Sequence, residues 1–300
     1  GFKSRRSDHK VVQMGTDKPK MVDQNFRYTQ VFSNTGHALS HLFMMIYPTV
    51  VLALEGEFSA PYHVLISLML AGNILFGAAA LPAGYLGDKW GAINMMVVFF
   101  FGTGLSAILI GLADNQIQIV LSFALVGFFG SIYHPVGIAW IARTIENRGK
   151  ALGINGVFGN MGVAAAPLVT GFLLAYGNWS ICFLVPGIAC LLYGVIFYYS
   201  LVPVETPYNF KKGNISEKFA PNWFQVFIAL MIATCSGGFI FGSLTFFIPR
   251  YFEIYMNNFT TSVLLTGILA SLVYAIASFA QIVVGSLIER FSKFFEIKIR

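Results

Sequence analysis

Eight long apolar runs constrain the fold of this chain more than any other feature of its sequence. None of them contains Asp, Glu, Lys or Arg away from its ends. A helix of about 20 apolar residues spans the hydrocarbon core of a bilayer, and continuous runs are unlike the alternating strands of a membrane barrel. The sequence therefore predicts an all-α membrane protein with eight transmembrane helices. They are expected at residues 32–54, 62–83, 92–112, 117–142, 151–176, 179–202, 223–248 and 259–288.

The composition excludes an ordinary soluble domain and a nucleic-acid-binding protein. Hydrophobic residues make up 56% of the chain and charged residues 11%, whereas soluble domains are about 25% charged. The net charge of +6 is divided among short clusters between the runs, with no basic stripe of the kind that binds nucleic acid. The three cysteines lie in apolar runs without metal-ligand spacing. We therefore predict no nucleic-acid partner, no cofactor and no metal site.

The basic residues predict how the chain crosses the membrane. Of the 19 Lys and Arg residues, all but Arg250 fall on one side when the eight runs are threaded through a bilayer. Cytoplasmic segments carry the excess of Lys and Arg, which predicts a multi-pass protein of the bacterial cytoplasmic (inner) membrane with a cytoplasmic N-terminus. The predicted segments are a tail (1–31), a six-helix bundle (32–202), a cytoplasmic linker (203–222) and part of a second bundle (223–300).

A short motif occurs after the second run and again after the eighth. Each copy has a glycine, three further residues, an acid and a base. Glycine allows close helix packing, and the charged pair suits a helix end at the membrane surface. The repetition indicates that the seventh and eighth helices repeat the first and second, as in transporters with two similar halves. The residues are Gly84, Asp88 and Lys89, followed by Gly91, in the first copy, and Gly285, Glu289 and Arg290 in the second.

In these residues the sequence resembles the major facilitator superfamily. The first motif is similar to the family's signature between helices 2 and 3, although Ala92 and Ile93 replace its trailing basic pair. The fifth run resembles the family's glycine-proline motif through Gly159, Gly162 and Pro167. Phe123 stands where drug/proton antiporters commonly carry an arginine in helix 4.

A narrower resemblance, to the fosmidomycin-resistance branch, rests on helices 1 and 4. The matching residues are His37 and the segment Tyr133-His134-Pro135. His41 departs from the branch, because an acid is usual at its position. The family fold has twelve helices, of which the first, fourth, seventh and tenth line a central cavity. The resemblance therefore implies that eight of twelve helices are present, that the chain is truncated, and that it is inactive without the remaining helices.

The resemblance implies a secondary active transporter and not an enzyme. It would move a small organic solute by alternating access, coupled to protons, as a monomer at full length in the lipid bilayer. The branch implies efflux of a drug-like or phosphonate-like compound, whereas Phe123 leaves uptake of a metabolite open as an alternative. A seven-helix-type receptor is disfavoured by the predicted cytoplasmic N-terminus, and an intramembrane enzyme by the absence of a nucleophile or metal box within the runs.

His37, His41 and His134 are the main candidates for chemistry. Apart from cysteine and tyrosine they are the only ionisable side chains well inside the runs. His37 and His41 are four residues apart and share a helix face. An imidazole titrates near neutral pH and could carry a coupling proton or bind an acidic solute. The alternative is that each histidine makes one hydrogen bond between helices.

Several other residues complete the candidate set. Tyr133, Trp140 and Ser236 are predicted as solute contacts, with packing as the alternative for the two aromatic residues. Pro135 and Pro167 are predicted to bend their helices, because proline cannot donate a backbone hydrogen bond. The glycines that recur at three-residue spacing in the fifth run are predicted to pack closely against another helix; they are Gly153, Gly156, Gly159 and Gly162. The acids at the outer end of the first helix, Glu55 and Glu57, are predicted to be solvated charges.

Overall fold

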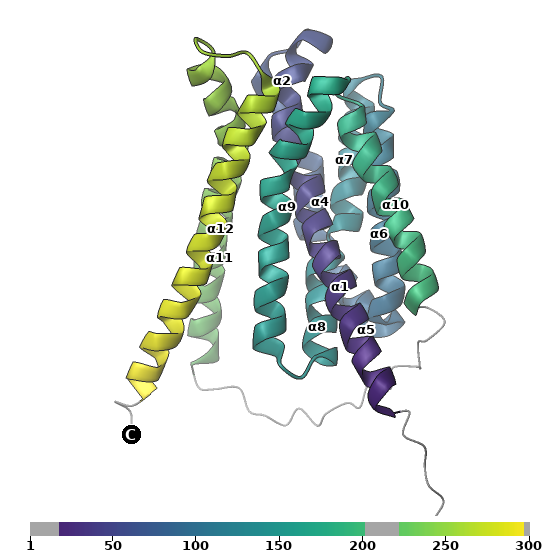
Figure 1. Cartoon of the computed structure of the whole chain (residues 1–300), viewed down its shortest axis with the longest axis vertical. Coiled ribbons are helices and arrows are strands. Elements are labelled where there is room, and N and C mark those ends of the chain that lie inside the picture. The colour runs from purple at the N-terminus through teal and green to yellow at the C-terminus, as the bar shows by residue number, and fades with distance from the viewer. Residues whose placement is uncertain (1–17, 202–221, 297–300) are drawn as a thin grey trace, which may run out of the picture.

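The computed structural model of the chain describes residues 18–201 and 222–296, with side chains described for residues 27–201 and 222–279. All the regular structure in these ranges is helical. The helices run side by side as an elongated bundle, with α11 and α12 along one flank (Figure 1). Predicted segments 1–17 and 203–221 lie outside the described residues.

The helix bounds follow the apolar runs closely. They are α1 Lys18–Met45, α2 Tyr47–Glu57, α3 Tyr62–Ser67, α4 Leu70–Ala78, α5 Ala80–Trp90, α6 Ala92–Gly111, α7 Gln116–Gly130, the π-helix η1 Tyr133–Gly137, α8 Ile138–Thr144, α9 Arg148–Tyr176, α10 Ile181–Leu201, α11 Trp223–Met256 and α12 Val263–Glu296. α1 begins earlier than predicted and α11 ends later, because a helix continues past the hydrocarbon core wherever water satisfies its polar side chains.

The all-α membrane fold is confirmed. Within the described residues, six helical stretches are long and apolar enough to cross a membrane, and α1 with α2 counts as one of them, as does the stretch from α7 to α8. A seventh span is the helix pair Tyr62–Ala78 and Ala80–Trp90, which bends by 45°. The eighth prediction corresponds to α12, whose apolar stretch within the described side chains is Val263–Phe279.

Prolines account for the irregular points in two spans. The 45° bend lies just before Pro82, which lacks the N–H group that would bond to the carbonyl of Ala78. In the fourth predicted run, Pro135 lies inside the π-helix η1. A π-helical turn adds a residue to the turn and is frequent at functional sites. It connects α7 to α8 and carries His134.

Glycines bring two helix pairs within the first six spans into backbone contact. A Cβ atom at Gly162 of α9 would meet the carbonyl oxygen of Ala38 in α1. At Gly127 of α7 it would meet the carbonyl oxygen of Gly72 in α4. Only glycine allows backbones to approach this closely.

The helix pair α9 and α12 packs in the same way. A Cβ atom at Gly267 would meet the carbonyl oxygen of Pro167, and one at Gly171 would lie 2.9 Å from the carbonyl oxygen of Val263 and 3.0 Å from the Cα of Leu264. Pro167 thus lies in the contact between α9 and α12.

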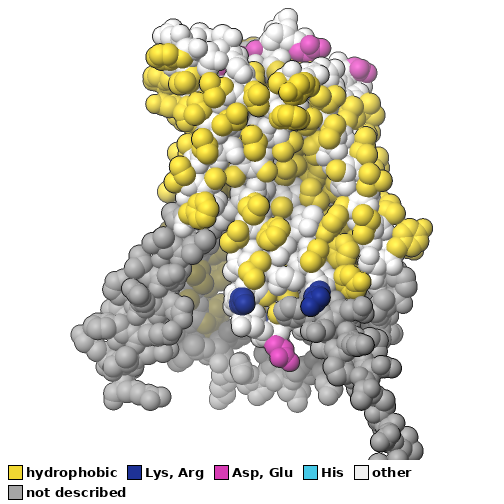
Figure 2. Space-filling view, in the orientation of Figure 1, with side chains coloured by type: hydrophobic (Ala, Val, Ile, Leu, Met, Phe, Trp, Pro, Cys, Tyr) yellow, Lys and Arg dark blue, Asp and Glu magenta, His cyan; other side chains and the backbone are white. Residues whose placement is uncertain are grey.

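The outer surface of the bundle is apolar over its middle. Leu81, Tyr176 and Phe239 are among the most exposed side chains, at 85%, 77% and 77%. Figure 2 shows hydrophobic side chains over the middle of the face, Lys and Arg at the end where α1 begins, and acidic side chains mainly at the opposite end. A surface of this kind suits lipid around its middle and water at its ends. The protein is an integral, multi-pass membrane protein.

Candidate functional site

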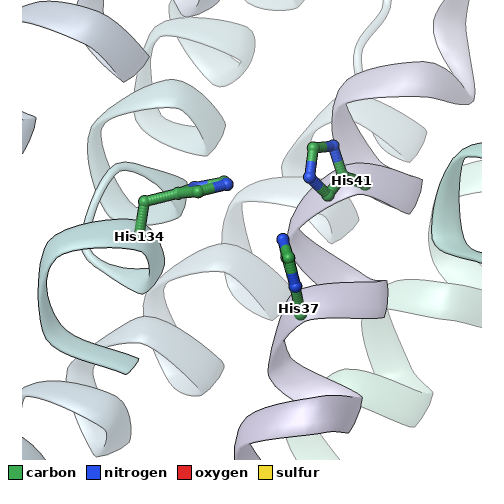
Figure 3. Close-up of side chains that lie close together, drawn as sticks. All are labelled: His37, His41 and His134. Atoms are coloured by element: carbon green, nitrogen blue, oxygen red, sulfur yellow. The ribbon is translucent and has the colours of Figure 1, made fainter. Parts of the chain in front are cut away.

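Three imidazole rings meet in the interior of the first six spans. His37 and His41 extend from successive turns of α1, and His134 extends toward them from η1 (Figure 3). The ring centres are 5.0 Å apart for His37 and His41, 5.2 Å for His37 and His134, and 5.4 Å for His41 and His134. His37 is buried, and the other two are half-buried. The structure therefore brings together all three histidines that the sequence singles out.

The ring of His37 is held on three sides. Its Nδ1 lies 2.8 Å from the backbone carbonyl oxygen of Asn155 in α9. Its face stacks on Tyr133, with ring centres 4.9 Å apart and an angle of 21° between the planes. A Cβ atom at Gly159 would lie 2.6 Å from Cε1 and 2.7 Å from Nε2 of the ring. The glycine of α9 thus leaves the room that the imidazole occupies.

A polar network beneath the histidines connects α1, η1 and α9. The amide nitrogen of Asn155 donates to Oδ1 of Asn34 at 3.0 Å and lies 2.8 Å from the hydroxyl of Tyr133. The hydroxyl of Ser33 lies 3.2 Å from that of Tyr133 and donates to the carbonyl of Gly137 at 3.1 Å. These groups are buried and satisfy one another, which holds the three elements in a defined arrangement.

Sequence reasoning missed Ser33 and Asn34. Both lie three to four residues before His37, so they share its helix face. A stripe of polar residues on one face of the first apolar run could therefore have identified both residues.

Two predicted solute contacts lie away from the histidines. Trp140 is 7% exposed in α8 and packs edge-on against Phe197, with ring centres 6.0 Å apart. Ser236 is exposed on α11. A cavity of about 190 Å³ lies between α9, α11 and α12, and its polar lining includes Asn160, Thr245 and Ser278 rather than Ser236.

The first loop motif forms an ion pair at the end of the bundle where α5 and α8 lie (Figure 1). Asp88 accepts a hydrogen bond from Nη2 of Arg143 at 2.7 Å.

Gly91 ends α5 with a φ angle of 89°, which glycine adopts without strain. A Cβ atom at Gly84 would lie 3.3 Å from Pro135, so α5 packs closely on η1, and Lys89 is exposed beside it. In the second copy, the side chains of Gly285, Glu289 and Arg290 lie outside the described residues.

For a transporter of the kind that the sequence resembles, we expect Asp88→Asn to slow transport while leaving stability nearly unchanged. The side chains of Asp88 and Arg143 are 54% and 37% exposed, and an exposed ion pair contributes at most about 1 kcal/mol to the free energy of unfolding. The pair nevertheless fixes the end of α5 to α8 as a single unit. Transport rates in liposomes and melting temperatures would be compared with those of Lys89→Gln, a neighbouring charge change. Transport by Asp88→Asn at the rate of the unmodified protein would contradict the prediction.

A second ion-pair cluster lies at the opposite end of the bundle. Nη1 of Arg250 in α11 donates to Glu55 of α2 at 2.7 Å and to Glu253 at 2.6 Å. Glu55 also accepts the backbone N–H of Tyr62 at 3.0 Å, and the guanidinium lies 4.8 Å from the centre of the Tyr62 ring. The prediction that Glu55 is a solvated charge is therefore wrong. Its partner is 195 residues away in the chain, and sequence spacing does not reveal such a contact.

Comparisons with known proteins identify relatives of the chain. The chain is 30% identical over 128 residues to the puromycin resistance protein pur8 of Streptomyces alboniger, covering 42% of this chain and 25% of that protein. It is 26% identical over 230 residues to YqjV, an uncharacterized MFS-type transporter of Bacillus subtilis, covering 74% of this chain and 54% of that protein. The chain therefore spans between a quarter and about half of the length of these relatives.

A similar fold occurs in a bacterial homolog of the human lysosomal transporter Spinster, solved in an inward-facing and unoccupied conformation. The TM-score is 0.71 at 16% identity, and the alignment covers 90% of this chain and 64% of that one. The sequence model of the Major Facilitator Superfamily matches residues 35–300. Since this match covers most of the chain, the chain belongs to the Major Facilitator Superfamily.

Proposed function

We propose that the protein moves a small organic solute across the membrane by alternating access. Its family and relatives are secondary transporters and not enzymes. The observation that carries the proposal is the cluster formed by Glu55 and Arg250, which ties α11 to α2 at one end of the bundle. Such a contact closes one side of a carrier while the other side is open.

The exposure along α11 supports an opening at the other end. Residues 223–241 of α11 are all exposed within the described chain, whereas Thr245 and Pro249 nearer its C-terminal end are buried. α11 thus packs near the ion-pair cluster, and Figure 1 shows α11 and α12 diverging together from α9 toward the end where α1 begins. We assign this arrangement to the inward-facing state, with the N-terminus in the cytoplasm.

The orientation and location rest on charge. Eighteen of the 19 Lys and Arg residues fall on the predicted cytoplasmic side, in agreement with the bias of cytoplasmic segments. Relatives from Streptomyces and Bacillus favour a bacterial cytoplasmic membrane.

Export of a drug-like compound is the direction that we propose. One relative is a puromycin resistance protein. The alternative of metabolite uptake is favoured by one observation: the helix 4 position where drug antiporters carry an arginine is Phe123. This side chain is 1% exposed and packs between Tyr47 and Phe183.

We expect the transported solute to raise the melting temperature of the purified full-length protein. A ligand that binds only the folded state at about 100 times its Kd stabilises it by about 2.7 kcal/mol. Candidate antibiotics and metabolites would be screened by thermal shift, and each compound that stabilises the protein would be tested for movement in liposomes of defined orientation. A stabilising compound that is moved outward supports export, and movement inward supports uptake. No movement of any stabilising compound would contradict the carrier proposal.

Proton coupling through His37, His41 and His134 stays a prediction, which the same liposomes test. The measurement is proton movement driven by a gradient of the solute. Full coupling in the triple His→Ala variant would remove the three histidines from that role.

A further inference from the structure

The three histidines have the spacing of a metal site. One ring nitrogen from each of His37, His41 and His134 can be chosen so that all three atoms lie within 4.8 Å of one another. In a tetrahedral zinc site with metal–nitrogen bonds of about 2.05 Å, the ligand nitrogens are about 3.4 Å apart and the ring centres about 5 Å apart. The observed ring centres, at 5.0, 5.2 and 5.4 Å, already match this spacing.

The present arrangement differs from a metal-bound one in the orientation of the imidazole rings. The widest nitrogen separation exceeds the tetrahedral value by about 1.4 Å. The ring of His37 is held by Asn155 and Tyr133, whereas rotation about χ2 of histidine has a broad energy profile. The rings of His41 and His134 can therefore turn their nitrogens toward that of His37 without moving α1 or η1.

We infer that His37, His41 and His134 form a binding site for a late first-row divalent metal ion, with Zn²⁺ as the probe. Imidazole nitrogen is a preferred ligand of zinc, copper and nickel, whereas Ca²⁺ and Mg²⁺ require oxygen ligands. The cluster found among the described residues contains three histidines and no carboxylate. Three protein ligands leave a fourth position for water or an anion.

The hydrogen bond of His37 prepares its other nitrogen as a ligand. The carbonyl oxygen of Asn155 can only accept, so the Nδ1 atom at 2.8 Å donates to it. The neutral ring then carries its lone pair on Nε2. Metal-binding histidines usually donate their other ring N–H to a carbonyl or carboxylate in this way, which fixes both the tautomer and the ring orientation.

The environment of the other rings also suits a bound ion. Nδ1 of His134 is buried and makes no hydrogen bond within the described chain. A buried polar atom without a partner is costly, and a metal ion at the cluster would supply one. Phe76 packs edge-on against the ring of His134, with centres 5.6 Å apart, and limits the directions in which this ring can turn.

Direct binding measurements test the inference on the purified full-length protein after removal of any polyhistidine tag. Isothermal titration with ZnCl₂ is expected to give one ion per chain. The variants His37→Ala, His41→Ala and His134→Ala are each expected to weaken binding by about 100-fold or more, since each removes one of three ligands. His63→Ala is the matched control, because His63 is exposed at the start of α3, and it should bind as the unmodified protein does.

A variant that keeps all three imidazoles adds an independent readout. Gly159→Ala would place a methyl group against Cε1 and Nε2 of His37, and we expect it to weaken zinc binding by about tenfold, within the range for changes around a ligand. X-ray absorption on the unmodified protein loaded with zinc is expected to show imidazole nitrogen ligands, and this result does not depend on whether any variant folds.

The outcomes separate this inference from the proposed function. Unchanged zinc binding in the triple His→Ala variant, or no zinc binding by the folded unmodified protein, overturns the metal site and leaves the solute carrier intact. Zinc binding that requires the three histidines supports the site even where no solute is moved. If the triple variant loses proton movement and the unmodified protein binds no zinc, the histidines carry protons instead, and the metal site is again overturned.

Discussion

Gly162→Ala is expected to lower the free energy of unfolding by about 3 kcal/mol, as overpacked cores do. The new methyl group would meet the carbonyl oxygen of Ala38, which is backbone and cannot turn away. The helices α1 and α9 would have to separate along the contact that also carries His37 and Asn155. The measurements are the melting temperature in detergent and the yield of folded protein from membranes.

Gly156→Ala provides the matched control on the same helix. No atom lies within 4 Å of a Cβ atom built at Gly156. Alanine has a higher helix propensity than glycine, by about 1 kcal/mol, so this variant should be as stable as the unmodified protein or slightly more so. Equal destabilisation by both substitutions would show that the contact between α1 and α9 does not determine the effect.

Arg250→Ala is expected to raise the population of molecules opened at the ion-pair end by about tenfold or more. A hydrogen bond to a charged group contributes about 1.5–3 kcal/mol, and about 1.4 kcal/mol corresponds to a factor of ten. The substitution removes one such bond between α11 and α2 together with the contact with Tyr62, whereas the bond to Glu253 lies within α11 and does not hold this end closed. Distances between spin labels on α2 and α11 would report the two populations.

Two further variants isolate the pair between Glu55 and Arg250. Glu57→Gln removes an exposed acid from the same end of α2 and should leave the label distances unchanged. Glu55→Arg combined with Arg250→Glu should restore part of the closed population that either single substitution loses. A closed population that is insensitive to all these changes would overturn the role given to this cluster.

The sequence predicted the spans because length and apolarity are local properties. It placed the helices from α3 to α10 within several residues of their positions, whereas α1 begins well before its predicted run and α11 and α12 end well after theirs, because polar ends extend these helices beyond the apolar run. It also paired His37 with His41, since four residues return a helix to the same face. The approach of His134 depends on how η1 packs against α1, which no local pattern encodes.

The prediction of close packing holds for Gly159 and Gly162 and is wrong for Gly153 and Gly156, for a geometric reason. Residues along an α-helix turn by about 100° each, so nine residues turn by a net half revolution of about 180°. Gly153 and Gly162 therefore lie on opposite faces of α9, and one of them had to face away from α1. A Cβ atom at Gly162 or Gly159 meets α1, whereas one at Gly153 or Gly156 has no atom of the described residues within 4 Å.

The contact of α9 with α12 has a mechanical consequence. Gly171 and Gly267 bring the two main chains together with little side-chain material between them. Side-chain packing between the same helices lies elsewhere along them, where Val163 and Ala164 of α9 meet Ala270 and Tyr274 of α12. For the proposed carrier, we therefore expect a tilt of α12 against α9 to turn about the glycine contact, where the fewest side chains would have to repack.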